Sequence, residues 1–340
     1  MGVKNFWGEL PKPFFVLAPL ANVTDAAFRR VIAKYSKPNG PQVMYTEFVS
    51  ADGLARANEE GKAKLMRDLL YSESERPIVA QFFTSTPEYM EKAAALAAEL
   101  GFDGIDINMG CPDKSVEKQG AGAKLILNPE RAKELVLAAK RGAPNLPVSV
   151  KTRLGYNKDI LEEWLPQILA AEPVVLTLHA RTRKEMSKVA AHWERVKRAV
   201  EIRDALGSKT LIVGNGDVVD MADAKVKAQE SGADGIMLGR AIFGKPWLFS
   251  PSEFGLQRSS GLASTAPDHL QTEFRLRVLV EHTKLFEELL GDVKNFAIMK
   301  KHFKSYVEGF DGAKDLRVKL MEATSAAEVE EFIKNFLAAR

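Results

Sequence analysis

The chain has 340 residues, 46% of them hydrophobic and 27% charged, with a net charge of +3 and one cysteine. This composition is typical of a globular protein with a sizeable core, and it excludes an intramolecular disulfide and a cysteine-rich metal site. The N-terminus lacks a signal-peptide pattern and no apolar run approaches a membrane span, so we expect a cytoplasmic protein with no membrane partner. We also expect a monomer that binds no metal.

Short apolar runs alternate with helical patterns over the first 240 or so residues, as in α/β proteins. We expect strands at 14–19, 42–47, 77–82, 104–108, 147–151, 174–179, 210–215 and 235–239. Helical patterns lie between them, for example at 86–101 and 128–142, and each ends in the glycine that helix C-termini favour. Eight such units predict a (β/α)8 TIM barrel, because an open doubly wound sheet usually has fewer strands and no GxGxxG follows the first strand.

Polar side chains gather where the predicted strands end, which is where active sites lie in this barrel. The residues at these ends are Ala18, Pro19, Glu47, Gln81, Asn108, Lys151, His179, Asn215, Gly239 and Arg240. A few of these polar residues are expected simply because the chain reaches solvent at a strand end. Burying the whole set would be costly unless the side chains met partners or a ligand. Cys111 lies three residues beyond the fourth strand on the same rim, either as a small buried hydrophobe or as a reactive group.

The loops after the last two strands, GNGDVVD (214–220) and GRAIFGKPW (239–247), are rich in glycine. In barrels these two loops commonly bind phosphate through backbone N–H groups, and Arg240 adds a charged donor. The pattern favours a phosphorylated cofactor or a phosphosugar substrate.

The other rim residues help to choose between these two ligands. Gln81 and Asn108 suit the polar edge of a flat heterocycle, and Lys151 suits a ring position that carries negative charge, as in reduced FMN. A phosphosugar isomerase stays open as an alternative, with Glu47 or Asp106 as its carboxylate base.

Beyond Trp247 the pattern changes from alternating units to a linker and then helices only. We expect a barrel domain at 1–249, a linker rich in Ser, Gly and Pro at 250–270, and a helical domain at 271–340.

The stretch 294–304 holds four lysines, one histidine and no acid, with Phe296 and Phe303 inside it and Tyr306 just beyond. Any single lysine fits a solvated helix face. The cluster, with its interleaved aromatic residues, predicts contact with nucleic-acid phosphates through Lys300 and Lys301.

Seven segments, in this order, resemble the tRNA-dihydrouridine synthases. They are APLANVTDAAFR (18–29), INMGCPDKSVEKQGAGAKLILNP (107–129), VKTRLG (150–155), LHARTR (178–183), GNGD (214–217), GRAIFGKPW (239–247) and MKKHFKSYVEGFDGAKDLR (299–317). The resemblance implies an FMN-bearing barrel with a helical tRNA-binding domain that reduces uridines of tRNA. NADPH is the implied reductant, with NADH left open because no dedicated dinucleotide motif is present.

The resemblance also implies roles for individual residues. Hydride passes from flavin N5 to C6 of uracil, and Cys111 protonates C5. The implied cofactor contacts are Ala18, Pro19, Gln81, Lys151, His179, Asn215, Gly216, Asp217, Gly239 and Arg240. The expected substrate contacts are Asn108, Arg153 and Arg181, with Lys300 and Lys301 added from the basic stretch. The chain departs from the family pattern at Leu20 and Asn22, where Met and Gly are more frequent, and at His192, where Asp is common.

The chemistry independently asks for an acid on the far face of the uracil ring. A thiol with a pKa near 8.5 holds its proton at neutral pH; Asp113 opposes thiolate formation and Lys114 favours it, which leaves the local balance open. Two other functions also stay open: an FMN barrel enzyme acting on a free pyrimidine or another small molecule, and a non-catalytic tRNA-binding protein.

Overall fold

Eight parallel strands form a closed ring in the computed structural model, which describes residues 5–250 and 268–339. The strands are β1 (Phe14–Leu17), β2 (Met44–Ser50), β3 (Ile78–Phe83), β4 (Gly104–Asn108), β5 (Val148–Arg153), β6 (Val175–His179), β7 (Leu211–Asn215) and β8 (Gly235–Leu238). From β2 to β8 each strand pairs with the next in sequence, and β8 pairs with β1. An isolated parallel bridge between Val16 of β1 and Val43, just before β2, completes the ring. The predicted TIM barrel is therefore confirmed.

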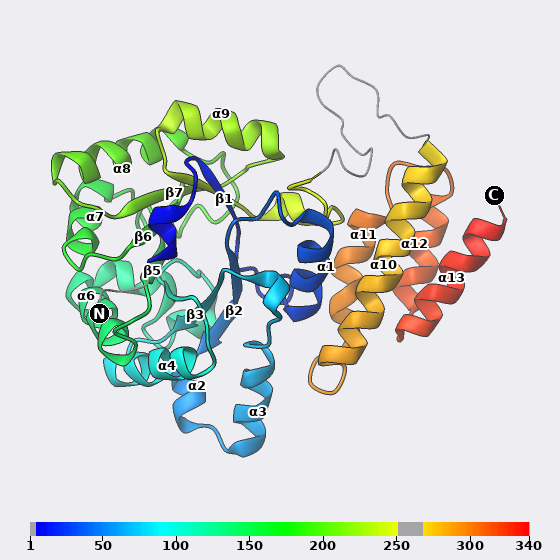
Figure 1. The fold of residues 1–340 in the computed structure, drawn as a ribbon, viewed down its shortest axis with the longest axis horizontal. Helices are drawn as coiled ribbons and strands as arrows, with labels where there is room; N and C mark the ends of the chain where they lie inside the picture. The colour runs from blue at the N-terminus through cyan, green and yellow to red at the C-terminus, as the bar shows by residue number, and fades with distance from the viewer. Residues whose placement is uncertain (1–4, 251–267, 340) are drawn as a thin grey trace.

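Helices surround the ring and continue beyond it (Figure 1). Those of the barrel are α1 (Ala26–Ser36), α2 (Ala51–Arg56), α3 (Glu59–Arg67), α4 (Pro87–Glu99), α5 (Lys114–Glu117), α6 (Pro129–Gly142), α7 (Leu161–Leu169), α8 (Trp193–Ala205) and α9 (Met221–Ser231). Beyond the barrel lie α10 (Asp268–Leu290), η6 (Phe296–Met299), α11 (Lys300–Tyr306), α12 (Ala313–Glu322) and α13 (Ala326–Ala338), which we call the helical region.

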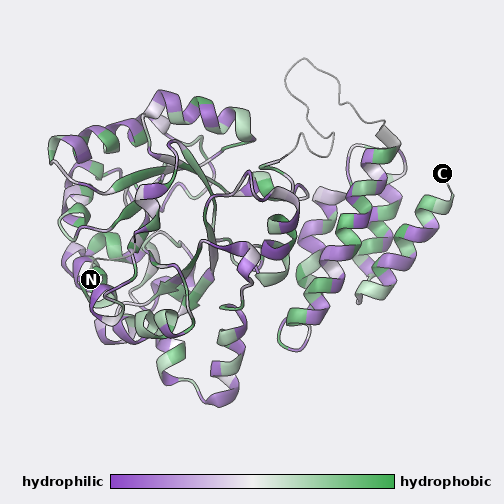
Figure 2. Cartoon of the chain, in the orientation of Figure 1, coloured by the Kyte–Doolittle hydropathy of each residue, from purple (hydrophilic) through white to green (hydrophobic). Residues whose placement is uncertain are grey.

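The interior of the ring holds both an apolar cluster, which we call the plug, and buried polar side chains such as Gln81, Asp106 and Thr177. The plug comprises Trp7, Phe14, Val16, Ala18, Val43, Tyr45, Val79, Val175, Val213 and Met237. The strands themselves are hydrophobic along most of their length, as Figure 2 shows. Because side chains alternate between the two faces of a strand, every second residue near the C-terminal ends of these strands faces the same interior space.

The two helices expected from glycine-terminated patterns both form, but their glycines serve different purposes. Gly101 follows α4 with φ +77°, the left-handed conformation that a helix C-terminus often needs. Gly142 instead ends α6 where it packs against α4, and a Cβ there would meet the carbonyl oxygen of Glu91 at 2.1 Å. Its role is close helix contact.

The helical region packs on the barrel through a shared hydrophobic cluster. Ala27 and Val31 of α1, together with Trp247, lie in one cluster with the buried residues of α10 to α13. The predicted linker falls largely outside the described residues, and α10 begins at Asp268, before the expected start of the helical domain.

No helix in the described part of the chain has the length and hydrophobicity that crossing a membrane requires. Within residues 5–250 and 268–339, no group of His, Cys, Asp and Glu side chains is arranged to hold a metal ion.

Candidate functional site

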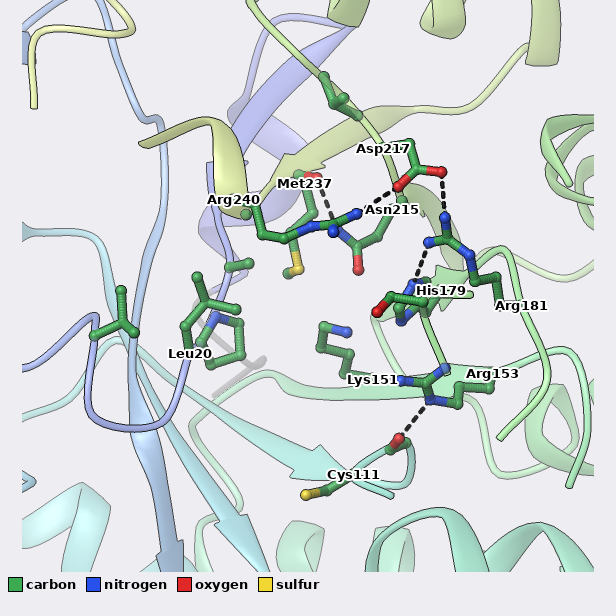
Figure 3. A pocket seen from close by; sticks show the side chains of 18 of the residues that line it. Leu20, Cys111, Lys151, Arg153, His179, Arg181, Asn215, Asp217, Met237 and Arg240 are labelled. Carbon is green, nitrogen blue, oxygen red and sulfur yellow. Dashed lines mark hydrogen bonds and ion pairs between the residues drawn. The ribbon is translucent and has the colours of Figure 1, made fainter. Parts of the chain in front are cut away.

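A cavity of about 970 Å³, the main cavity, opens at the C-terminal ends of the strands (Figure 3). The residues expected there that do line it are Ala18, Pro19, Asn108, Cys111, Lys151, Arg153, His179, Arg181, Asn215, Gly216, Asp217, Gly239 and Arg240. Gln81 lies behind this lining and is fully buried, and Lys300 and Lys301 lie in α11. The main cavity thus brings together the expected residues apart from these three and Glu47, which does not line it either.

Asn108 holds the loop that carries Cys111. Its side-chain oxygen accepts hydrogen bonds from the backbone N–H groups of Gly110 (3.1 Å) and Cys111 (2.9 Å), and its amide nitrogen donates to Gln81 Oε1 at 3.1 Å. Gln81 Nε2 in turn donates to Asp106 Oδ2 at 2.6 Å. Because a carboxylate can only accept, Asp106 fixes the orientation of Gln81, and Gln81 then fixes that of Asn108. We call this row of three side chains the amide chain.

Asp106 is the buried end of the amide chain. Ser149 Oγ donates to its other oxygen at 2.6 Å, and burial raises the Asp106 pKa to about 6 although these hydrogen bonds lower it. The carboxyl is therefore largely ionised at neutral pH.

The isomerase alternative needs a carboxylate that reaches the substrate, and neither expected base does so. Asp106 is fully buried below the lining, and Glu47 lies at a shift in the β2–β3 register that turns its side chain toward α1 and the helical region. Asp217 is the single carboxylate among the described residues that line the main cavity.

The Cys111 thiol keeps its proton at neutral pH. Burial raises its pKa and the Asp113 carboxylate adds to the rise, against the opposing effects of the Asp113 backbone N–H, Arg153 and Lys151. The backbone on either side is held too, since Cys111 O accepts from the Ala123 N–H at 2.9 Å. A protonated, fixed thiol can act as a general acid, whereas a nucleophile would need a depressed pKa.

Three basic side chains stand between Cys111 and the opposite end of the main cavity. Burial, with the nearby charge of Arg153, lowers the Lys151 pKa to about 8, which leaves the ammonium mostly charged at neutral pH. Burial and the surrounding cations hold the His179 pKa well below its ordinary value, so that the imidazole is neutral. Arg153 Nε donates to the carbonyl oxygen of Gly110 at 2.7 Å, which ties β5 to the Cys111 loop.

Asp217 organises the end of the main cavity opposite Cys111 (Figure 3). It forms ion pairs with Arg181 and, at 2.6 Å, with Arg240, and its Oδ2 accepts from the Ala191 N–H at 2.9 Å. Arg181 is buried and also contacts His179 Nε2 at 3.2 Å, while the Arg240 side chain is 64% exposed. Two arginines against one carboxylate leave net positive charge.

The glycine-rich turn beside Asp217 brings the backbone close to the cavity. Gly216 has φ +133°, and a Cβ there would lie 2.8 Å from the Ala191 Cβ. Asn215 Nδ2 is occupied by the carbonyl oxygen of Met237 at 2.9 Å, so it acts as a brace between β7 and β8. Bare backbone and net positive charge suit a phosphate.

Sequence reasoning missed several lining residues, among them Phe48, Met186, Ser187 and Met237. Strand alternation could have found Met237, since it lies two residues before Gly239 on the same face of the strand. Met186 and Ser187 lie in the long loop after β6, where no sequence pattern predicts the path of the chain.

The structure places all three residues that depart from the family pattern. Leu20 lines the main cavity, and Asn22 has φ +53°, a conformation that Asn tolerates better than most residues. His192 lies beside Glu185 (3.2 Å) and Glu194 (3.5 Å), outside the cavity.

In the helical region, the basic stretch is divided between surface and core. Lys301 is exposed, and Lys300 with Phe296 lines a second cavity of about 410 Å³. Phe303 and Tyr306 are fully buried. The expectation that these two aromatic residues alternate with lysines on a nucleic-acid surface is therefore wrong, because they form the core of the helical region.

Comparison with solved structures supports the fold. The barrel resembles histamine dehydrogenase from Rhizobium sp. 4-9 (TM-score 0.51, 13% identity, 80% of this chain and 48% of that chain). It also resembles 6-hydroxypseudooxynicotine amine oxidase from Pseudomonas geniculata N1 (TM-score 0.53, 13% identity, 82% and 53%). At this identity the likeness concerns the fold alone.

Sequence comparison is more specific. A probable tRNA-dihydrouridine synthase of Staphylococcus aureus (strain COL) is 39% identical over 98% of this chain and 96% of that protein. A probable tRNA-dihydrouridine synthase 2 of Bacillus subtilis (strain 168) is 40% identical over 98% and 97%. The family model described as dihydrouridine synthase (Dus) matches residues 16–339. The chain therefore belongs to the dihydrouridine synthase family.

Proposed function

We propose that this protein is an FMN-dependent tRNA-dihydrouridine synthase, which reduces uridines of tRNA to 5,6-dihydrouridine with NADPH or NADH as the reductant. The observation that carries the proposal is the protonated Cys111 thiol, held at one end of a cavity whose other end is glycine-rich and cationic. The relatives from S. aureus and B. subtilis, which match over almost their whole length, bear the corresponding name.

The lining of the main cavity fits FMN. Gly216 and the backbone at Gly239, with the exposed Arg240, offer donors and positive charge for the single phosphate. Ala18 and Pro19 give an apolar wall for a flat ring, and Lys151 offers an ammonium to the negative charge of the reduced ring.

Cys111 supplies the proton of the reaction. When bound, FMN supplies the hydride that adds to C6 of uracil, and the nicotinamide nucleotide supplies the electrons that restore it. The addition leaves negative charge on C4–O4 and C5, and the thiol quenches this charge by protonating C5. The resulting thiolate, stabilised by Arg153 and Lys151, regains a proton from solvent.

The target base must leave its stack, since the reaction needs both faces of the ring. Asn108 and Arg153 lie beside Cys111 and suit the polar edge of uracil, and Arg181 lies farther along the lining. Lys300 and Lys301 are proposed to contact tRNA phosphates. The Lys300→Glu/Lys301→Glu variant should bind tRNA more weakly with a shallower salt dependence; unchanged affinity at low salt would rule out this contact.

Replacement of the thiol tests the main proposal. Cys111→Ala should retain bound FMN, and NADPH should still bleach the flavin absorbance, but reduction of tRNA uridine should fall at least about a hundredfold, as for a lost general acid. Native turnover of tRNA by this variant would contradict the acid role. A wild-type protein that binds no flavin would contradict the cofactor, and reduction of free uridine at the rate for tRNA would favour the small-molecule alternative.

A further inference from the structure

One lysine of the basic stretch does not face solvent. Lys294 lies between α10 and η6, and its side chain is 12% exposed. Its ammonium nitrogen lies 2.5 Å from Glu47 Oε2 and 2.7 Å from Asp68 Oδ1, both carboxylates of the barrel. The lysine therefore belongs to the junction between the helical region and the barrel.

Glu47 connects Lys294 to the loop that lines one side of the main cavity. Its side chain is 6% exposed, and its other oxygen accepts a hydrogen bond from the backbone N–H of Asn22. Asn22 is in the left-handed conformation, and its neighbours Leu20, Ala21 and Val23 line the main cavity. A row of contacts thus runs from Lys294 through Glu47 to the loop at 18–23, although neither of these two side chains lines the cavity itself.

The charges explain why this row depends on the lysine. Burial lowers the pKa of Lys294, but the Glu47 and Asp68 carboxylates more than offset this, and the pKa lies above its ordinary value. Asp25, buried beside them, has its pKa raised to about 7 by burial and by the charge of Glu47. Without Lys294, Glu47 would be a buried, unpaired carboxylate that repels Asp25, and it would gain by turning toward solvent and releasing Asn22.

We propose that Lys294 is a positioning residue: through Glu47 it lets the docked helical region hold the loop at 18–23 against the main cavity, so that the barrel binds FMN fully only with the helical region in place. The inference rests on the proposed flavin function. It separates Lys294 from Lys300 and Lys301, whose proposed partner is tRNA.

Titration of full-length apoprotein with FMN tests the proposal. Lys294→Met should weaken FMN binding about tenfold, equivalent to about 1.4 kcal/mol of lost loop ordering, and leave the salt dependence of tRNA binding unchanged. Lys304→Met, in the same stretch but exposed, is the matched control and should leave FMN binding unaltered. Equal FMN affinity in Lys294→Met and the wild type would overturn the inference, whereas absence of FMN binding by the wild type would overturn the proposed function.

A second variant separates positioning from general loss of stability. Glu47→Gln/Lys294→Met keeps an acceptor for the Asn22 N–H and needs no cation, so it should recover most of the FMN affinity lost in Lys294→Met. If Lys294→Met does not fold, Glu47→Gln alone carries the test. Lys294 and the Asn22 N–H both donate to Glu47, so the NH2 group of a glutamine would have to face one of these donors, and FMN affinity should fall. Failure of the double variant to recover affinity, or native affinity in Glu47→Gln, would contradict the proposed row of contacts.

Discussion

Removal of the carboxylate that ends the amide chain should slow the reaction of the Cys111 thiol, although Asp106 itself does not line the main cavity. In Asp106→Leu, the buried Gln81 amide loses its acceptor at 2.6 Å and is free to turn over. If Gln81 turns, Asn108 meets a donor instead of an acceptor and turns as well, so that the backbone N–H groups of Gly110 and Cys111 lose their shared oxygen.

The cost follows from the number of hydrogen bonds lost. Two backbone hydrogen bonds at about 1 kcal/mol each give about 2 kcal/mol of lost loop ordering, or roughly a 30-fold smaller population of correctly placed thiol. A displacement of the acid by about 1 Å can slow the chemical step about a hundredfold. We therefore expect uridine reduction by Asp106→Leu to slow by about 30- to 100-fold, with roughly 1–3 kcal/mol of lost stability for the unpartnered Gln81 amide.

Asp106→Asn is the matched control, because it removes the charge but keeps an acceptor. Its oxygen can face Gln81 while its NH2 group donates to Ser149 Oγ, whose hydroxyl also reaches the Ile105 carbonyl oxygen at 3.2 Å. Its rate should therefore stay near that of the wild type.

The assay is single-turnover reduction of tRNA by pre-reduced enzyme. The rate at which the Cys111 thiol is alkylated reports whether the loop still holds the thiol in place, and the rate at which NADPH bleaches the flavin should not change. A native rate in Asp106→Leu, or an Asp106→Asn variant as slow as Asp106→Leu, would refute the reasoning.

Three further predictions concern stability, measured by urea unfolding. Burial lowers the His302 pKa to about 3, so below pH 6.5 the unfolded chain binds a proton that the folded chain does not. This histidine should therefore lower the free energy of unfolding by roughly 2 kcal/mol between pH 6.5 and 5, a loss that His302→Phe should remove. A stability difference between the two proteins that does not change with pH would disprove this. The Asp25 pKa is raised from 3.8 to about 7, so the stability of the folded protein falls as pH rises across that range. The Asp25→Asn variant keeps the side-chain cap on α1, and its free energy of unfolding should exceed that of the wild type by up to roughly 4 kcal/mol at pH 8 and by nothing near pH 4. Gly142→Ala forces a methyl group against the Glu91 carbonyl oxygen and should cost about 1–3 kcal/mol; full stability would mean that the two helices separate without cost.

The barrel and most of the main cavity could be predicted from sequence because parallel buried strands and their polar ends leave a local pattern. Lys151, His179 and Asn215 follow apolar runs, and the fold alone brings such ends together. The exact ends of the strands could not be predicted, because they depend on pairing partners far away in sequence. Strand β5 extends to Arg153, beyond the predicted end at Lys151, because Thr152 and Arg153 pair with Leu178 and His179 of β6.

Side-chain orientation was the harder part. Gln81 and Glu47 both lie near the predicted ends of their strands, yet Gln81 is held behind the lining by Asp106. Glu47 instead turns toward Lys294, almost 250 residues away in sequence. Phe303 and Tyr306 lie among lysines in the sequence but point to the opposite side of their helix. No local pattern records such partners, since each depends on elements that meet only in the folded chain.

The hydrophobic cluster that α1 shares with the helical region also bears on how the protein can be divided. Phe28 of α1 stacks on His282 of α10 with ring centroids 4.7 Å apart, and Ala27, Val31 and Trp247 belong to the same cluster as the core of the helical region. The two parts are therefore held together by burial as well as by the peptide that joins them. Separately expressed halves would each expose an apolar face, and co-expression of the two polypeptides is the way to recover a native particle from split genes.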